Sequence, residues 1–163
     1  MALVGPYGGA EAIYESTIDK GLGPCLHAHR DDVKGVQVHP LEGRLRLHLA
    51  GRMGRAWRLP LTRPNSWASL DHLEQACVAR LGVPYDLLGA FQARTFGFGW
   101  TRRFRRTRTD ANRKFYCNEF CLDVFRDIGW AGAGVIPSNE NPKSTVALLV
   151  KRGICDEPEE ILL

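Results

Sequence analysis

Apolar residues recur at helical spacing between positions 114 and 129. The apolar positions fall at i, i+4, i+7, i+8 and i+11, which is one face of a helix; they are Cys117, Cys121, Val124, Phe125 and Ile128. Gly129 follows at the place where a left-handed residue commonly ends a helix. The pattern therefore predicts a helix that begins near Cys117 and buries one face.

Two further helices are predicted on either side of this stretch. Leu70, Leu73, Cys77 and Leu81 form a second apolar stripe, which a polar segment at 64–69 precedes and Gly82 ends. A short helix is expected over 144–152, with Ser144 as its N-cap.

Strand patterns dominate the first 50 residues. An apolar start at 1–4, a turn-rich segment at 5–9 and a strand at 10–17 predict a hairpin. The segment 33–41 alternates and is closed by Pro40, which favours another strand. The segment 45–49 alternates strictly, but it lies in a stretch rich in helix formers, so both a strand and a helix remain open.

These elements predict one α+β domain spanning 1–163, in which an antiparallel sheet packs against the helix that begins at Cys117. A chain of 163 residues is long enough to bury a core without metal or disulfide crosslinks. The last residues, 152–163, contain the acidic run 156–160 and are expected to fray.

Composition is that of an ordinary soluble domain, with 44% hydrophobic and 25% charged residues. The five cysteines are odd in number and follow no paired framework, so reduced thiols are expected. No apolar run is long enough to span a membrane, and no signal segment opens the chain. A cytoplasmic or otherwise unexported protein is the default expectation.

The net charge of +4 is unevenly distributed. The segment 102–114 holds seven basic residues and one acid, a net charge of +6, so the other 150 residues carry −2. Aromatic residues precede and interrupt this charged run; they are Phe96, Phe98, Trp100 and Phe104. We define the basic arm as 96–114, which includes these residues. The arm is either a solvated loop or a grip for an anionic polymer or phosphate surface, such as nucleic acid, lipid headgroups or cell-wall polymer.

Cys117 is the first candidate for chemistry. In the first turn of a helix, unpaired backbone N–H groups and the positive end of the helix dipole favour a thiolate. The alternative is that Cys117 is a small core residue, since free cysteine is among the most buried residue types.

Three separated segments carry a resemblance to a known family. They are the strand segment 13–17 (Ile-Tyr-Glu-Ser-Thr), the turn 82–86 (Gly-Val-Pro-Tyr-Asp) and the helix start 116–119 (Tyr-Cys-Asn-Glu). In order and spacing they resemble the circularly permuted NlpC-type cysteine hydrolases, the YiiX/YebB-like branch of the papain-like superfamily. The resemblance spans roughly residues 1–150 and implies a papain-like fold.

The resemblance also implies a role for each matching position. Cys117 would be the nucleophile, and Glu15 the polar residue that orients a catalytic histidine. Tyr85, Asp86 and Tyr116 would line the substrate-binding cleft. An edge carboxylate for Glu15 and an ordinary turn at 85–86 are the alternatives, and no metal or organic cofactor is implied.

The family histidine is missing from the printed chain. Counting back from Glu15, the expected Ser-His-Val would place its histidine just before Met1, so we expect a natural chain that starts upstream and carries it. Among the histidines present, His39 is the fallback base, because it ends a strand expected beside that of Glu15. His27 and His29 are interpreted as surface loop residues and His72 as exposed on its helix.

The resulting expectation is a cysteine hydrolase that cleaves amide or peptide bonds, or ester or thioester bonds, through an acyl-enzyme on Cys117. Peptidoglycan-type peptides are the leading substrate class, followed by lipids and other amides. The rival is a catalytically inactive homologue that binds an anionic partner through the basic arm.

Overall fold

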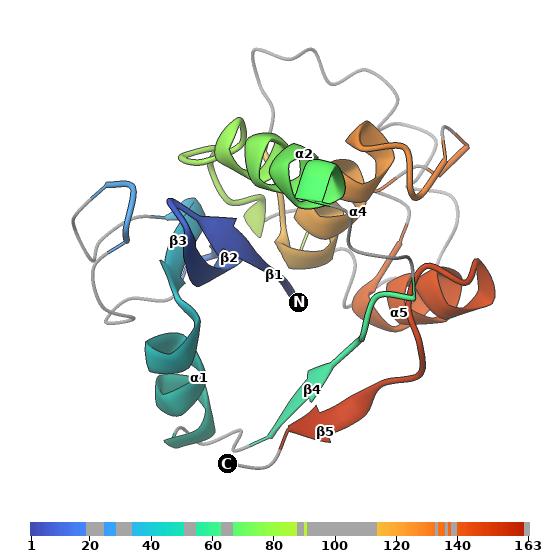
Figure 1. The fold of residues 1–163 in the computed structure, drawn as a ribbon, viewed down its shortest axis with the longest axis horizontal. Helices are drawn as coiled ribbons and strands as arrows, with labels where there is room; N and C mark the ends of the chain where they lie inside the picture. The colour runs from blue at the N-terminus through green and yellow to red at the C-terminus, as the bar shows by residue number, and fades with distance from the viewer. Residues whose placement is uncertain are drawn as a thin grey trace.

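The computed structural model describes most of the chain outside the basic arm. The described residues are 1–18, 25–28, 34–50, 55–62, 67–87, 90, 114–132, 134–135, 137 and 140–161. They form a mixed α+β structure with two small antiparallel sheets and the helices α1, α2, α4 and α5 (Figure 1). The predicted α+β class is confirmed at this level. None of the described helices has the length and hydropathy that a membrane crossing requires.

The main sheet consists of β1 (Ala2–Tyr7), β2 (Ala10–Thr17) and β3 (Gly35–Pro40), in the order β1-β2-β3. β1 and β2 form the predicted hairpin, which turns at Gly8 and Gly9. Both glycines have positive φ angles, 59° and 84°, as a tight two-residue turn requires. The strand predicted over 33–41 is confirmed as β3.

The two faces of this sheet bury different chemistry. Since Leu3 lies opposite Tyr14 and Tyr14 opposite Val38, these three side chains share one face. Glu15 lies opposite Ala2 on β1 and Gln37 on β3, and these residues share the other face. The sheet therefore separates an apolar face from a face with buried polar groups.

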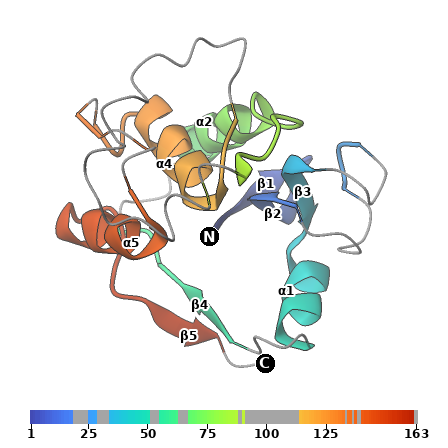
Figure 2. The ribbon, with the colours of Figure 1, turned by 180° about the vertical axis from the view of Figure 1, so that it is seen from behind.

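Helices α2 (Trp67–Val78) and α4 (Cys117–Asp127) pack on the apolar face. They lie side by side in both orientations of the ribbon (Figures 1 and 2). The core between them and the sheet includes Tyr14, Leu73, Phe120 and Val124, each at most 2% exposed. Both predicted helices are confirmed, and Gly129 follows α4 with a φ of 79° as its predicted C-terminal residue.

Helix α1 (Leu41–Ala50) follows β3 directly, so of the two readings open for 45–49 the helix is correct. The alternating leucines do not share a buried face, because Arg44 is the only buried residue of α1. The local preference of Leu, Glu and Arg for helix decides the conformation here. Helix α1 contacts β2 and β3, and Arg44 reaches the polar face of the sheet.

Helix α5 (Pro142–Lys151) begins earlier than predicted. Asn141 is its N-cap, and Ser144 is the reciprocal partner of Asn141 in a capping box, so Ser144 as N-cap was wrong. Pro142 stands in the first turn, where proline is well tolerated.

The C-terminal segment is paired, which differs from the expectation of fraying. β5 (Glu159–Ile161) pairs with β4 (Ala56–Arg58) in a two-stranded sheet. Exposed ion pairs join Arg55 to Glu160 and Arg58 to Glu159, both at 2.7 Å. The acidic run thus finds basic partners more than 100 residues earlier in the sequence.

Candidate functional site

Cys117 is the first residue of α4 and the only one of the five cysteines that is not buried. Its N-cap residue, Tyr116, has an extended backbone with φ −99° and ψ 170°. The thiol therefore stands at a helix start, where backbone N–H groups lack intrahelical acceptors. These N–H groups are suited to stabilise an oxyanion. Cys117 is therefore not the fully buried core residue that was the alternative interpretation.

The two neighbours of Cys117 are both tied to one carbonyl oxygen. The Tyr116 hydroxyl donates to the Glu140 carbonyl at 2.7 Å, and the Asn118 amide donates to the same oxygen at 2.8 Å. The Asn118 amide also donates to the Thr145 hydroxyl of α5 at 3.2 Å. Cys117 is thus held from both sides by the segment that leads into α5.

The three segments behind the family resemblance meet at Phe115, two residues before Cys117. The Phe115 carbonyl accepts the Ser16 hydroxyl at 2.8 Å and the Asp86 backbone N–H at 2.9 Å. Phe115 N–H in turn donates to the Pro84 carbonyl at 3.1 Å. The strand of Glu15, the turn at 82–86 and the start of α4 are therefore adjacent in space.

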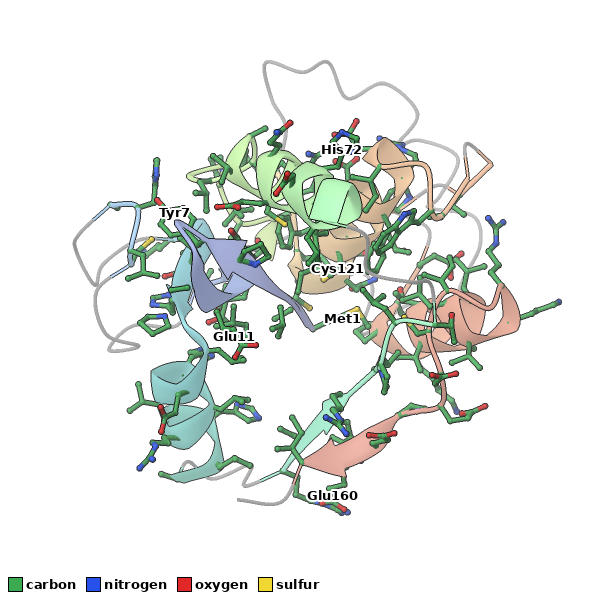
Figure 3. All side chains as sticks on the ribbon, viewed as in Figure 1. Met1, Tyr7, Glu11, His72, Cys121 and Glu160 are labelled. Carbon is green, nitrogen blue, oxygen red and sulfur yellow. The ribbon has the colours of Figure 1, made fainter. Side chains whose placement is uncertain are left out.

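The amino group of Met1 lies against the thiol of Cys117. Cys117, Cys121 and Glu15 all lie close enough to act electrostatically on this amino group. Burial lowers the pKa of this amino group, but the neighbouring Cys117, Cys121 and Glu15 raise it by more, so the net shift is upward. Figure 3 shows Met1 at the start of β1 beside Cys121 of α4.

Glu15 has a partner that the sequence reasoning missed. Arg44 of α1 makes a two-pronged ion pair with it, with Nε–Oε1 at 2.5 Å and Nη2–Oε2 at 3.1 Å. Both residues are buried, at 8% and 9% exposed. The sequence left the segment after Arg44 open between strand and helix. The contact with Glu15 becomes evident only once this segment is known to be a helix in which Arg44 is buried.

The remaining predicted site residues lie in different settings. His39 is 1% exposed, and its Nε2 pairs with Gln37 Oε1 at 2.9 Å. β2 lies between β3, the strand of His39, and β1. Met1, directly before β1, is the residue near Cys117, so this placement does not favour His39 as the base.

Tyr85 is the most accessible of the predicted substrate contacts. It is half-buried and forms a parallel bridge with Phe115, whereas Asp86 is 3% exposed. Tyr116 is 2% exposed, and its hydroxyl is engaged by Glu140, so its role in the structure is to anchor the helix start. Of the three, only Tyr85 has side-chain surface to offer a ligand.

The other residues singled out in the sequence lie either on the surface or outside the described part of the chain. His27 and His72 are exposed, as expected, while His29 and the basic arm up to residue 113 lie outside the described residues. Within the described part of the chain, no three His, Cys, Asp or Glu side chains are grouped as a metal site would need.

Comparisons with protein-family models, with curated proteins and with solved structures find no match to this chain.

Proposed function

We propose that this protein is a cysteine hydrolase of papain-like architecture that cleaves amide or peptide bonds, or ester or thioester bonds, through an acyl-enzyme on Cys117. The observation that carries the proposal is the position of Cys117, a half-buried cysteine that begins a packed helix, whose start is hydrogen-bonded through Ser16 and Phe115 to the strand of Glu15. A nucleophilic thiol needs this kind of accessible and polar setting.

The proposed reaction proceeds in two steps. The Cys117 sulfur attacks the substrate carbonyl carbon, and the oxyanion is held by the N–H groups of the α4 start. The bond between the carbonyl carbon and the leaving group breaks, and the leaving amine, alcohol or thiol takes the proton that the acid–base group removed from Cys117. Water then hydrolyses the thioester, which releases the acid and restores the thiol. Rigid anchoring by Tyr116 and Asn118 keeps the sulfur in place through both steps.

The mechanism requires an acid–base group beside the sulfur, and we propose a histidine for it, as the family resemblance implies. The prediction of a family histidine immediately before Met1 stays a prediction.

Peptidoglycan-type peptides are the proposed leading substrate class, on the strength of the family resemblance alone, with lipid or other amide substrates next. Half-buried Tyr85, bridged to Phe115, is the proposed substrate contact.

A thiol-reactive probe such as iodoacetamide, used at mildly acidic to neutral pH and read by peptide mass spectrometry, tests the nucleophile. Cys117 should be modified at least about tenfold faster than the other cysteines, because those are buried. Burial also raises the pKa of the Cys77 thiol to about 12 and that of Cys155 to about 11, which keeps them protonated. Comparable modification of Cys77 and Cys117 would contradict the proposal.

Turnover of a fluorogenic peptide amide tests the chemistry. Cys117→Ser should abolish hydrolysis, whereas Cys25→Ser, a change at a buried cysteine, should leave the rate within about twofold if the protein stays folded. Loss of activity in both variants with retained folding would argue against Cys117 as the nucleophile.

The alternative proposal is a binding protein that holds an anionic partner through the basic arm. Its support is the charge of +6 within 102–114. Replacing Arg102, Arg103, Arg105 and Arg106 by glutamine should remove salt-sensitive association with an anionic polymer, and leave Cys117 labelling unchanged. Salt-insensitive binding, or binding unchanged by the substitutions, would exclude this role.

A further inference from the structure

Helix α4 begins without the side-chain cap that commonly holds a helix start. Its N-cap residue is Tyr116, whose side chain makes no capping hydrogen bond and instead donates to the Glu140 carbonyl at 2.7 Å. The first turn is the least restrained part of a helix, because its N–H groups have no intrahelical acceptors. Cys117, the first residue of α4, therefore depends on contacts from outside the helix for its position.

Asn118, the next residue of α4, supplies such a contact. Its side chain is fully buried, and its amide nitrogen donates to the Glu140 carbonyl at 2.8 Å and to the Thr145 hydroxyl at 3.2 Å. A side-chain amide carries two N–H donors, so both donors of Asn118 are used. The residue that follows Cys117 is thus held at two points by the beginning of α5.

Both acceptors belong to a well-restrained turn. Glu140 directly precedes Asn141, the N-cap of α5, which exchanges two hydrogen bonds with Ser144, both at 2.9 Å. Thr145 follows Ser144, and its backbone N–H donates to the Asn141 carbonyl at 2.8 Å. The capping box therefore fixes the Glu140 carbonyl and the Thr145 hydroxyl relative to each other.

Stability does not explain why Thr145 is polar. Thr145 and Leu149 are the buried residues of α5, and at a spacing of four residues they lie on the same face. Valine has the same branched shape and would bury no hydroxyl group there. The contact also has a cost, because the buried Oδ1 of Asn118 has no hydrogen-bond partner among the residues that the structure describes.

We propose that Thr145 is a positioning residue for the Cys117 site: its hydroxyl holds the Asn118 amide, and this contact fixes the first turn of α4 and with it the sulfur. The inference rests on the proposed function of Cys117 as the nucleophile. It assigns a role in the site to α5, an element that contains none of the predicted site residues.

Amide hydrogen exchange, measured by NMR, tests the contact. The Phe120 N–H donates to the Tyr116 carbonyl at 3.0 Å in the first turn of α4, and Val124 lies one turn further along the helix. In Thr145→Val, the ratio of the Phe120 exchange rate to the Val124 exchange rate should rise about tenfold, because only the helix start is loosened. A general loss of stability speeds both exchange rates and leaves their ratio unchanged.

Two further variants of α5 serve as controls. Thr145→Ser keeps the hydroxyl and should keep the exchange ratio within about threefold of that of the unmodified protein. Leu149→Val removes one methylene from the same buried face, so it should destabilise the protein without changing the ratio. An unchanged ratio in Thr145→Val, or an equal rise in Leu149→Val, would overturn the inference. Should Thr145→Val fail to fold, Thr145→Ala removes the same hydroxyl and must raise the ratio.

A double variant tests whether Thr145 acts through Asn118. Asn118→Leu removes the amide, so adding Thr145→Val to it should change the exchange ratio by less than about twofold. A further tenfold rise in the double variant would show that Thr145 acts by another route and would refute the inference.

Turnover of the fluorogenic peptide amide tests the link to the reaction. Thr145→Val should lower kcat about tenfold at unchanged KM, because a displaced sulfur weakens the transition state without weakening substrate binding, and Thr145→Ser should restore kcat. Hydrogen exchange does not require turnover. A raised exchange ratio without hydrolysis even by the unmodified protein would support the contact and argue against the hydrolase. Hydrolysis by Cys117 with an unchanged kcat in Thr145→Val would support the hydrolase and refute the role of Thr145.

Discussion

Gly35 has a φ of 121°, in the left-handed half of the backbone map, and the peptide of Val83 lies directly against its Cα. A Cβ at this position would fall inside contact distance of the Val83 carbonyl oxygen and at 3.0 Å from Pro84 Cα. Both atoms belong to the turn at 82–86, which continues to Phe115 through backbone hydrogen bonds. The close approach of β3 to this turn therefore depends on the absence of a side chain.

Gly35→Ala should lower the free energy of unfolding by about 3 kcal/mol, from backbone strain together with displacement of the 82–86 turn. Urea titration followed by circular dichroism measures this. The matched control is Gly43→Ala in α1, where a Cβ meets nothing within 4 Å, and a gain of about 0.5 kcal/mol is expected from helix propensity. Equal changes in the free energy of unfolding for the two substitutions would show that the contact between Gly35 and the Val83 peptide leaves room for a methyl group.

Single residues also show where sequence reasoning succeeds and where it stops. Cys117 was identified as the thiol at a helix start because helical periodicity is a local signal that the chain itself carries. Arg44 was missed, because its partner Glu15 is 29 residues away and the pairing depends on where α1 leaves the sheet. The placement of His39 likewise depends on strand order, which no local pattern encodes.

At the scale of elements, α2 and α4 are joined by a buried ionic network near their C-terminal ends. Arg80, 5% exposed, pairs with Asp123 at 2.8 Å, with the Ala76 carbonyl at 2.6 Å and with Asp127 at 3.1 Å. Arg126 holds the other oxygen of Asp123 at 2.6 Å. The network fixes the helix that carries Cys117 against α2.

Asp123→Ala should destabilise the protein by about 3 kcal/mol or more, because it leaves the Arg80 guanidinium buried without its main partner. Thermal and urea unfolding measure the loss. The control is Glu42→Ala, which breaks the exposed Glu42–Arg46 pair of α1 and should cost less than about 0.5 kcal/mol. A loss below about 1 kcal/mol for Asp123→Ala would mean that the network contributes little.

The elements themselves were largely predictable where a pattern is strong and local. The hairpin, β3, α2 and α4 follow from alternation, apolar stripes and glycine signals. Helix α1 was left ambiguous, because Leu45, Leu47 and Leu49 alternate with polar residues as in a strand although the segment forms a helix. The start of α5 was placed too late, because Ser144 has the chemistry of an N-cap but serves as the reciprocal partner of Asn141.

At the scale of the whole molecule, the C-terminal segment runs back along residues 55–62. Asp156 N–H donates to the Pro60 carbonyl at 2.8 Å and Thr62 N–H to the Ile154 carbonyl at 3.1 Å. Ile154 and Cys155 are buried, whereas Glu159 and Glu160 are exposed. The expectation of a frayed tail from 152 onward ignored these long-range partners, which lie about 90 residues earlier and are invisible to a local reading.

Two truncations separate the parts of this segment. Ending the chain after Glu157 removes β5 and two exposed ion pairs, and should cost about 1 kcal/mol while leaving Cys117 labelling unchanged. Ending it after Arg152 also removes buried Ile154 and Cys155, and should cost about 3 kcal/mol or more. Thermal unfolding and mass spectrometry measure both, and equal losses would contradict this division.

The Glu140 carbonyl, which accepts both the Tyr116 hydroxyl and the Asn118 amide, makes a mechanical link between two remote parts of the chain. Any force or ligand that pulls residue 140 away from the body would release both flanks of Cys117 at once. Under the proposed function, tension on a segment more than 20 residues downstream would therefore displace the proposed nucleophile without any change to the cysteine itself.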